Sequence, residues 1–497
     1  MTPLFTSYIT FNLLIFVSLL SITNHSHARQ HPKTSDSLVL GLTNTRTTIK
    51  LPKQSSSTLN LKLTSSPSSP TLDMMEPLTE VRDGYLISLN LGSPPQIIQV
   101  YMDTGSDLTW VPCGNLSFNC INCDDYPNNT PMSKFSPFQS SSCVRDSCVS
   151  NLCINVHSSD NPYDPCNIAG CSLTTLIKGT CSRPCPSFVY MYGEGVVSGT
   201  LTRDTLRVHG SSVTREVTNF GFGCVGSTYR EPIGIAGFGK GSLSLPSQLG
   251  FQEMGFSHCF LAFKFANNPN VSSPLVLGDL AISSNDQNQL QFTPMLKNPM
   301  YPNYYYIGLE GLSLGIGSGS LIQVPTILRD FDSSGNGGML IDSGTTYTHL
   351  PKPFYSLLLS ELESAIKHPR ATEVEERTGF DLCYRVPCTN NVTNGVTIMD
   401  VDDHLLPSIT FHFMNNVSLV LPQGNNFYAM GAPRNSSVVK CLLFQSMDDD
   451  EGYGPAGVFG SFQQQNVEVV YDMKMGRIGF QTMDCASSSA FQQLHKL

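Results

Sequence analysis

The sequence predicts a mainly β protein built from two related halves. Only 14% of its 497 residues are charged, while Gly, Pro, Ser, Thr and Asn are plentiful, and this composition favours strands and turns over long helices. An acidic turn occurs twice, as VYMDTGSDLTW at residues 100–110 and as MLIDSGTTYTHL at residues 339–350. Each turn is followed by an apolar pair that leads to glycine, in PIGIAGFG (232–239) and in AGVFGSFQQQ (456–465). These repeats indicate two divergent copies of one unit.

Strand and helix positions follow from the apolar patterns. Alternating or short apolar runs bounded by turn residues predict strands. The predicted strands are residues 84–92, 96–103, 187–193, 200–208, 273–279, 304–315, 408–413, 417–422, 440–444 and 467–472. The first two form a hairpin around the turn Ser93-Pro94-Pro95. One amphipathic helix is predicted at residues 353–368, with Phe354, Leu358, Leu362 and Ile366 on one face.

The N-terminus predicts entry into the secretory pathway. The apolar run FNLLIFVSLLSI (11–22) is short for a membrane span and precedes Ser26-His27-Ala28, a small-residue cleavage site. We assign residues 1–28 to a signal peptide, although no Lys or Arg precedes the apolar run, and a retained anchor is the alternative. The C-terminal tail, residues 486–497, lacks the apolar segment of a lipid anchor, so no membrane anchor is expected in the mature form.

Residues 29–82 are rich in Ser, Thr and Pro, and little there could form a packed core. The chain before residue 79 holds six basic and three acidic residues, whereas the remainder holds 23 basic and 36 acidic. A basic leader before an acidic body indicates a removable pro-segment held by charge. A disordered linker is the alternative.

Overall charge and length exclude some functions. The net charge is −10 and the pI about 5.5, with no basic stripe, so nucleic acid is not an expected partner. A chain of 497 residues is too long for one core. No feature indicates an oligomer, and a monomer is expected.

Cysteines and sequons both indicate an oxidising compartment. Sixteen cysteines allow up to eight disulfides, and ten of them crowd into a loop-like region between Cys113 and Cys185. The pair Cys120 and Cys123, with His157 in range, could bind zinc, but disulfide-stapled loops suit a secreted chain better. Candidate N-glycosylation sites are Asn115, Asn128, Asn270, Asn391, Asn416 and Asn435.

The duplicated aspartates, Asp103 and Asp342, predict a catalytic pair. A lone Asp-Thr-Gly is usually an ordinary turn, but two copies with matching surroundings are not explained that way. Two carboxyl groups within hydrogen-bonding range share one proton and titrate together. One could then take a proton from a water molecule that attacks a peptide carbonyl, while the other protonates the carbonyl oxygen. No covalent intermediate, metal or cofactor is needed.

The residues after each aspartate have matching physical tasks. The glycine lets backbone amides approach the carboxyl group closely. The hydroxyl after the glycine can bond the outer carboxyl oxygen, and the hydroxyl before it could bond across the two halves and fix their spacing. These residues are Thr104, Gly105 and Ser106 in the first copy and Ser343, Gly344 and Thr345 in the second.

On these motifs the chain resembles the pepsin-like aspartic proteases, in particular the plant nepenthesin and nucellin-like branch. The likeness includes the cysteine-rich insertion after TWVPC, GFGC (221–224), GFGKGSLSLPSQL (237–249) and VFGSFQQQN (458–466). It implies a bilobed, mainly β fold with an active-site cleft between an N-terminal lobe at residues 83–298 and a C-terminal lobe at residues 299–485.

The resemblance also assigns a flap. Tyr192, directly before Gly193, matches the family's flap tyrosine, and Trp110 matches the indole that donates to it. A core tryptophan is the alternative. The flap reads GEGVVSG where many relatives have Asp and Ser. In the C-terminal lobe the family suggests disulfides pairing Cys383 with Cys441 and Cys259 with Cys485, and it leaves Cys388 unassigned.

The function that follows is a secreted, glycosylated aspartic endopeptidase that acts on polypeptide substrates at acid pH, in the cell wall or the vacuole. The main alternative is a catalytically silent relative that inhibits cell-wall glycosidases by binding them. A glycosidase that uses the two acids is a third idea, which nothing else in the sequence supports.

Overall fold

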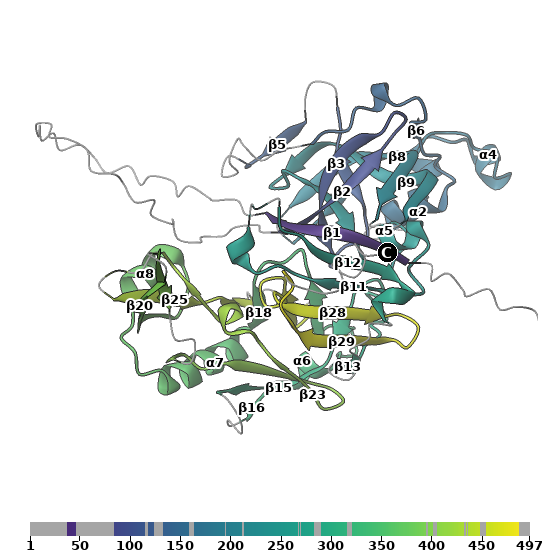
Figure 1. Cartoon of the computed structure of the whole chain (residues 1–497). Helices are drawn as coiled ribbons and strands as arrows, with labels where there is room; N and C mark the ends of the chain where they lie inside the picture. The colour runs from purple at the N-terminus through teal and green to yellow at the C-terminus, as the bar shows by residue number, and fades with distance from the viewer. Residues whose placement is uncertain are drawn as a thin grey trace, which may run out of the picture. The chain divides into compact units, whose positions relative to one another are not determined.

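Strands make up most of the regular structure in the computed structural model of the chain, which confirms the predicted mainly β fold (Figure 1). The structure describes residues 37–45, 84–114, 118–123, 133–158, 164–193, 195–210, 213–266, 268, 270–282, 290–315, 321–393, 396–400, 405–431, 434, 436–447 and 454–486. Of residues 45, 389–393 and 396–400 it describes the backbone only. All of these residues belong to a single unit that spans residues 37–497.

The first lobe is one large sheet with five short helices, of which η1 is a 3-10 helix. Its strands are β2 (Gly84–Leu91), β3 (Gln96–Asp103), β4 (Trp110–Pro112), β5 (Asn119–Ile121), β6 (Val144–Arg145), β7 (Ser187–Met191), β8 (Val196–His209), β9 (Thr214–Tyr229) and β10 (Gly234–Gly237). Its helices are η1 (Pro137–Gln139), α2 (Asn151–Ser158), α3 (Pro165–Ile168), α4 (Leu173–Ile177) and α5 (Leu245–Leu249).

A second group of strands continues this sheet. It contains β1 (Ser37–Thr45), β11 (Phe256–Cys259), β12 (Ser273–Gly278), β13 (Gln291–Pro294), β28 (Val467–Asp472) and β29 (Arg477–Thr482), with η2 (Phe263–Phe265) and η3 (Asp279–Ala281). The strand order runs β13-β29-β28-β11-β12-β1-β2-β3-β10-β4-β9-β8-β6, so the last strands of the chain lie in the same sheet as the first lobe.

The second lobe consists of smaller sheets. Its strands are β14 (Tyr306–Ile307), β15 (Leu309–Leu314), β16 (Leu321–Gln323), β17 (Met339–Asp342), β18 (Thr348–Pro351), β19 (Cys383–Pro387), β20 (Thr389–Thr393), β21 (Val396–Asp400), β22 (Ile409–Phe413), β23 (Val417–Val420), β24 (Phe427–Ala429), β25 (Ser437–Leu442), β26 (Phe444–Met447) and β27 (Gly457–Gly460). Its helices are α6 (Thr326–Arg329), α7 (Lys352–Ala365), α8 (Thr372–Thr378) and η5 (Gln423–Asn425). In α7, the predicted amphipathic helix, Phe354, Leu358 and Leu362 are buried.

The two predicted copies have the same local topology. In the first, β3 pairs in parallel with β10, which pairs antiparallel with β4. In the second, β17 pairs in parallel with β27, which pairs antiparallel with β18. Asp103 lies opposite Gly237 and Asp342 lies opposite Gly460, so each apolar-glycine motif is the strand beside an acidic turn. The sequence repeat is therefore a structural repeat.

Strand β1 corrects one expectation. It lies within residues 29–82, which the sequence suggests can contribute little to a packed core. That expectation is wrong for residues 37–45, because Leu38, Leu40 and Leu42 are buried in the main hydrophobic core. Three leucines at every second position give this strand an apolar face. The average composition of residues 29–82 does not show it.

The register shows what β1 joins. Residues 37–42 pair with β12, and residues 43–45 pair with β2. In the strand order β1 is therefore the link between the first lobe and the strands that follow it. Thr45 is paired with Gly84, so the two described residues that flank residues 46–83 are neighbours in the sheet.

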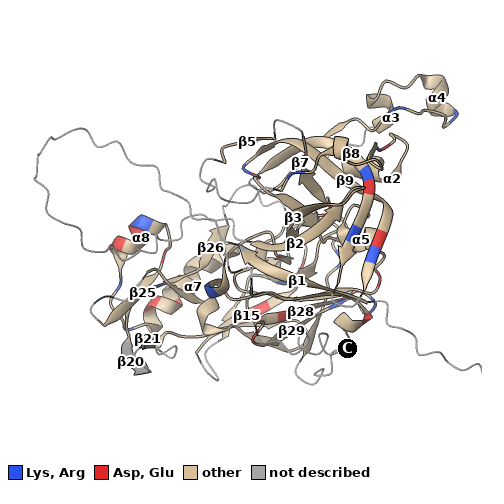
Figure 2. Cartoon of the chain, turned by 45° about the horizontal axis from the view of Figure 1, so that its top comes forward, with Lys and Arg blue, Asp and Glu red and all other residues tan. Residues whose placement is uncertain are grey.

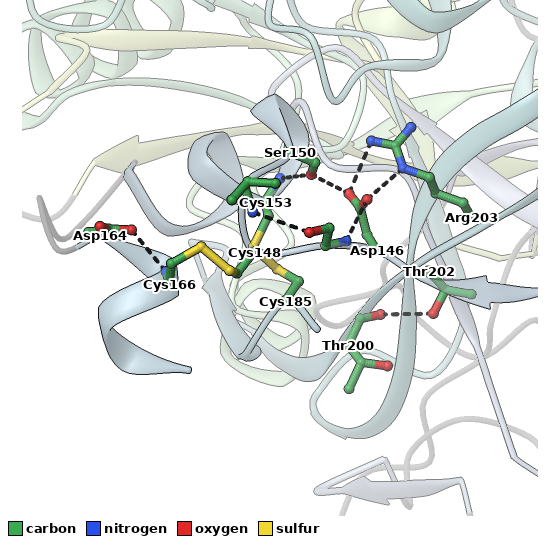
Figure 3. The surroundings of a disulfide bond; sticks show 12 residues. Asp146, Cys148, Ser150, Cys153, Asp164, Cys166, Cys185, Thr200, Thr202 and Arg203 are labelled. Carbon is green, nitrogen blue, oxygen red and sulfur yellow. Dashed lines mark hydrogen bonds and ion pairs between the residues drawn. A yellow bond between two sulfur atoms is a disulfide. The ribbon is translucent and has the colours of Figure 1, made fainter. Parts of the chain in front are cut away.

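The cysteine-rich region holds helices α2, α3 and α4 where the sequence suggests loops. Figure 3 shows the Cys148–Cys166 disulfide, beside which Asp164 begins α3 by accepting a hydrogen bond from the backbone N–H of Cys166 at 2.9 Å. Such short helices lack the repeated apolar spacing that predicts longer ones, and they are held by caps and cross-links.

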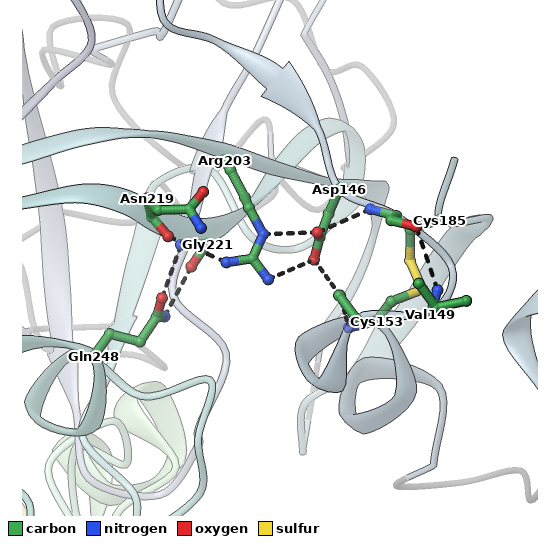
Figure 4. A network of polar contacts seen from close by, with 10 residues as sticks. Asp146, Val149, Cys153, Cys185, Arg203, Asn219, Gly221 and Gln248 are labelled. Atoms are coloured by element: carbon green, nitrogen blue, oxygen red, sulfur yellow. Dashed lines mark hydrogen bonds and ion pairs between the residues drawn. A yellow bond between two sulfur atoms is a disulfide. The ribbon is translucent and has the colours of Figure 1, made fainter. Parts of the chain in front are cut away.

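Charged residues of both signs alternate along the strands of the first lobe rather than forming a stripe of one sign (Figure 2). Arg207 on β8 pairs with Glu216 on β9 at 2.6 Å. Arg203 pairs with the buried Asp146 at 2.7 Å (Figure 4). The Asp146 carboxylate also accepts a hydrogen bond from the Ser150 hydroxyl (Figure 3). This network lies in the cysteine-rich part of the lobe.

The position of β1 makes a stability prediction. Leu42 is completely buried, so Leu42→Ala should lower the stability of the unprocessed chain by ~2–5 kcal/mol, seen as a lower midpoint of thermal unfolding. Thr43→Ala, on the opposite face of the same strand, is the matched control and should have a smaller effect. Equal midpoints for the Leu42 variant and the unaltered chain would show that β1 does not contribute to the folded core.

Candidate active site

The two aspartates are the last residues of equivalent strands. Asp103 ends β3 and Asp342 ends β17. The apolar residues before each aspartate bury the strand, so the carboxyl group is delivered to the end of a rigid element rather than to a free loop. Asp103 is only 5% exposed, and Asp342 is partly buried.

Reciprocal hydrogen bonds tie the two turns together. The Thr104 N–H donates to the Ser343 hydroxyl oxygen at 3.0 Å, and the Ser343 N–H donates to the Thr104 hydroxyl oxygen at 2.9 Å. Each hydroxyl then donates to a backbone carbonyl of the other lobe, Thr104 to Ile341 at 3.1 Å and Ser343 to Met102 at 2.9 Å. Four hydrogen bonds therefore fix the distance between the two turns, and all of the residues that make them are buried.

Each carboxyl group is held by its own turn. Asp103 accepts hydrogen bonds from the Gly105 N–H at 2.9 Å and from the Ser106 hydroxyl. Asp342 likewise accepts from the N–H of the following glycine at 2.8 Å and from the Thr345 hydroxyl at 2.6 Å. These bonds leave each aspartate one rotamer and aim it at its counterpart.

The glycines let the carboxyl groups approach across the lobes. A Cβ atom on Gly105 would lie 2.5 Å from the nearest carboxyl oxygen of Asp342. A Cβ atom on Gly344 would lie 2.4 Å from a carboxyl oxygen of Asp103. Any side chain at either position would push the two acids apart, so these glycines are required for space.

The electrostatics of the pair follow from this geometry. Burial raises the pKa of Asp103 well above its usual range, and the charge of Asp342 and a hydrogen bond between the two carboxyl groups raise it further. The hydrogen bonds from Ser106 and Gly105 act in the opposite direction and lower the pKa of Asp103. The proton of Asp103 is therefore held more tightly than that of an exposed aspartic acid.

The predicted flap residues meet each other. The Trp110 indole N–H donates to the Tyr192 hydroxyl at 2.8 Å, and Trp110 is completely buried. The Tyr192 N–H donates to the Gly195 carbonyl at 2.7 Å, which closes the turn between β7 and β8 around Gly193. The sequence offered two roles for Trp110, a core residue or a partner of the flap tyrosine. It has both, because its ring is buried while its N–H donates to Tyr192.

Sequence reasoning missed one buried acid beside the pair. Asp107 is 8% exposed and accepts hydrogen bonds from the Gly241 N–H at 2.7 Å and from the Asn303 side-chain amide at 2.6 Å. The sequence signal that could have revealed Asp107 is the repeated glycine in GFGKG, because such glycines often mark a place where another group lies against the backbone.

The cysteines form seven disulfides rather than the eight that their number allows. The bonds are Cys113–Cys224, Cys120–Cys123, Cys148–Cys166, Cys153–Cys185, Cys171–Cys181, Cys259–Cys485 and Cys383–Cys441. Cys143 and Cys388 are free. Two groups of cysteine sulfur atoms, one of them with His157, lie close enough together to bind a metal ion. The cysteines of both groups are joined as disulfides instead.

The candidate glycosylation sites are only partly described. Asn270 and Asn416 are exposed. Asn391 is described by its backbone in β20. Asn115, Asn128 and Asn435 lie outside the described residues, as do residues 1–28, the predicted signal peptide, and residues 487–497. None of the helices in the described part of the chain is both long and apolar enough to cross a membrane.

Comparison with known proteins decides the family. Residues 85–279 match the family described as Xylanase inhibitor N-terminal, and residues 304–482 match Xylanase inhibitor C-terminal. A protein of Arabidopsis thaliana described as a probable aspartyl protease is 37% identical over 437 residues, covering 81% of this chain and 82% of that protein. The aspartic proteinase nepenthesin-1 of Nepenthes gracilis is 31% identical over 411 residues, covering 81% and 78%. The chain belongs to the plant branch of the pepsin-like aspartic protease family.

Solved structures agree on the fold. Basic 7S globulin from soybean superposes with a TM-score of 0.56 at 15% identity, covering 91% of this chain and 99% of that one. The structure titled edgp gives a TM-score of 0.57 at 17% identity, covering 90% and 95%. At such identities the likeness concerns the bilobed β fold and not the activity, and the predicted fold class and family are both confirmed.

The raised pKa of Asp103 makes the stability of this protein depend on pH. A carboxyl whose folded pKa is raised contributes stability that is present below its unfolded pKa of about 4 and lost as pH rises through the folded pKa. Asp103→Asn should therefore raise the midpoint of thermal unfolding at neutral pH and leave it nearly unchanged at about pH 3.

The matched control for this measurement is Asp279→Asn, an exposed acid on η3 that pairs with Lys474. It should not reproduce the pH-dependent gain. If Asp103→Asn shifted the midpoint equally at both pH values, the burial and the like charge around Asp103 would not act on its proton.

Proposed function

We propose that the chain is an aspartic endopeptidase that hydrolyses peptide bonds at acid pH, using a water molecule activated between Asp103 and Asp342. The observation that carries the proposal is the pair of equivalent turns, whose carboxyl groups interact and whose spacing is fixed by the Thr104–Ser343 hydrogen bonds. The sequence similarity to named aspartic proteinases supports it.

The mechanism assigns opposite roles to the two acids. Asp103, the more buried, carries the shared proton, and Asp342 takes a proton from the water molecule as it attacks the substrate carbonyl carbon. Asp103 gives its proton to the carbonyl oxygen, which produces a neutral tetrahedral intermediate. Asp342 then gives its proton to the amine nitrogen as the C–N bond breaks, while Asp103 takes a proton back from one hydroxyl of the intermediate. The products are a carboxylic acid and an amine, and the pair returns to its starting state.

The rest of the site positions the peptide. Tyr192, held by the Trp110 indole, would cover the bound peptide and exclude bulk water. The family fold supports an extended polypeptide substrate lying between the two lobes, with apolar side chains beside the bond that is cut. The chain itself supplies every group that the reaction needs.

The proposal extends to processing and location. Residues 1–28 would be a signal peptide, residues 29–82 a pro-segment, 83–298 and 299–485 the two lobes, and 486–497 a tail. Seven disulfides and the exposed Asn270 and Asn416 are consistent with passage through the secretory pathway to the cell wall or vacuole. Because β1 is built into the sheet, removal of the entire pro-segment requires this strand to leave its place between β12 and β2.

A second candidate is a protein that inhibits a glycosidase without cutting anything. The family that the chain matches is described as xylanase inhibitors, and this favours an inhibitor. The intact aspartates, their hydroxyl partners and the Trp110–Tyr192 bond favour the protease, since a binding protein has no need of two acids that share a proton.

The test is digestion of a denatured protein substrate at acid pH by the processed protein, with and without pepstatin. The wild type should cut in a pepstatin-sensitive manner, and Asp103→Asn should lose roughly 10²–10⁴-fold or more of the activity, because it removes the acid that shares the proton. Asp279→Asn, an exposed acid remote from the pair, is the control and should cut like the wild type.

Two outcomes would overturn the proposal. A folded, processed wild type that does not cut but binds a xylanase tightly would establish the inhibitor. Cleavage that survives Asp103→Asn would mean that other residues perform the reaction.

A further inference from the structure

Asp107 connects three segments of the chain. It follows Asp103 by four residues, on the segment between β3 and β4. Its carboxyl group accepts from the Gly241 N–H, on the loop after β10, and from the amide of Asn303, just before β14 in the second lobe. Next to these bonds, the Lys240 N–H donates to the Asn303 carbonyl at 2.8 Å, and the Gly239 N–H donates to the Ser106 carbonyl at 2.9 Å.

The glycines of GFGKG are explained by this acid. A Cβ atom on Gly239 would lie 2.3 Å from one carboxyl oxygen of Asp107, and a Cβ atom on Gly241 would lie 2.2 Å from the other. On Gly237 it would lie 2.2 Å from the backbone carbonyl of Asp107. The loop is therefore wrapped around the Asp107 carboxyl group, which has one position available.

The same residue contacts the base of the flap. Tyr190 lies close enough to Asp107 for the two residues to interact electrostatically, and the Tyr190 ring lies 5.2 Å from the Tyr192 ring, centroid to centroid. The second copy of the repeat has Thr346 at the matching place, four residues after Asp342. The acid is thus specific to the turn that carries Asp103.

We propose that Asp107 is a positioning residue: its carboxyl group clamps the Asp103 turn to the Gly241 loop and to Asn303 of the second lobe, and thereby sets the separation of the two catalytic carboxyls. This inference rests on the proposed protease function. The Thr104–Ser343 bonds fix the turns on one side of the pair, and the Asp107 clamp fixes the Asp103 turn on another. An error of about 1 Å at this separation is enough to lower the rate by about 10²-fold.

Burial of Asp107 makes the clamp tolerant of acid. Burial raises the pKa of Asp107 to about 6, against the hydrogen bonds from Gly241 and Asn303 and the positive charge of Lys240, which lower it. The other titratable groups that interact with it are Tyr190 on β7 and Tyr305, two residues after Asn303. Because this pKa is raised, Asp107 contributes stability that is present at acid pH and lost as pH rises through about 6.

The experiment measures kcat per active site, with sites counted by pepstatin titration so that unfolded protein is excluded. Asp107→Ala should lower kcat by roughly 10–10²-fold with KM changed by less than about threefold, because the chemistry and not the binding depends on the spacing. Asp107→Asn should retain most of the activity, since an amide can accept from Gly241 and Asn303 can turn its own amide around.

Partner and control variants separate positioning from general stability. Asn303→Ala should lower kcat in the same way, and adding it to Asp107→Ala should have little further effect, because both remove one contact. Asp146→Ala removes another buried acid of the same lobe. Asp146 forms an ion pair with Arg203 at 2.7 Å and has no contact with the two catalytic aspartates (Figure 4). It should lower the unfolding midpoint and leave kcat per site unchanged.

A second readout needs no catalysis. The pH-dependent gain in unfolding midpoint caused by Asp103→Asn reports the combined effect of burial and of Asp342 on the pKa of Asp103. It should shrink when Asp107→Ala is also present, because the two acids would then lie farther apart. If that gain is the same with and without Asp107→Ala, or if Asp107→Ala lowers kcat no more than Asp146→Ala, the positioning inference is wrong. A wild type that does not cut would overturn the proposed function alone, and the midpoint measurement would still judge the clamp.

Discussion

The reciprocal hydrogen bonds between Thr104 and Ser343 are the constraint on which the rest of the site depends. Two acidic side chains repel each other when ionised, and folding brings this pair together only because their backbones are tied. Each hydroxyl both accepts from the opposite N–H and donates to the opposite lobe's carbonyl, so none of these buried groups is left without a partner. Because the bonds join a residue of one lobe to a residue of the other, movement of one lobe against the other acts directly on the shared proton.

Acid conditions suit this architecture for a consistent reason. Burial raises the pKa of Asp103 and, more modestly, that of Asp107, so both groups can be buried as neutral acids where the proposed reaction takes place. At the acid pH of the proposed reaction, the fold therefore does not have to bury Asp103 and Asp107 as negative charges. The hydrogen bonds from Ser106 and Gly105 lower the pKa of Asp103, so that it is not raised so far that the acid could no longer give up its proton.

The sequence predicted the elements whose signal is local. Alternating apolar runs placed β2, β3, β12, β22 and β28, and the matching turns identified Asp103, Asp342 and the hydroxyl residues around them. It could not reveal β1, whose partners lie far along the chain, or the helices of the cysteine-rich region, which depend on disulfides. Asp107 was missed because its role appears only when Gly241 and Asn303, 134 and 196 residues away, are brought to its carboxyl group.

A neutron crystal structure of the protein at mildly acid pH tests the central claim most directly, since it locates hydrogen nuclei. The account predicts a single deuteron shared by the facing oxygens of Asp103 and Asp342, with one solvent molecule bonded to both carboxyl groups. Two separated carboxyl groups, each with its own protonation state and no solvent held in common, would contradict it.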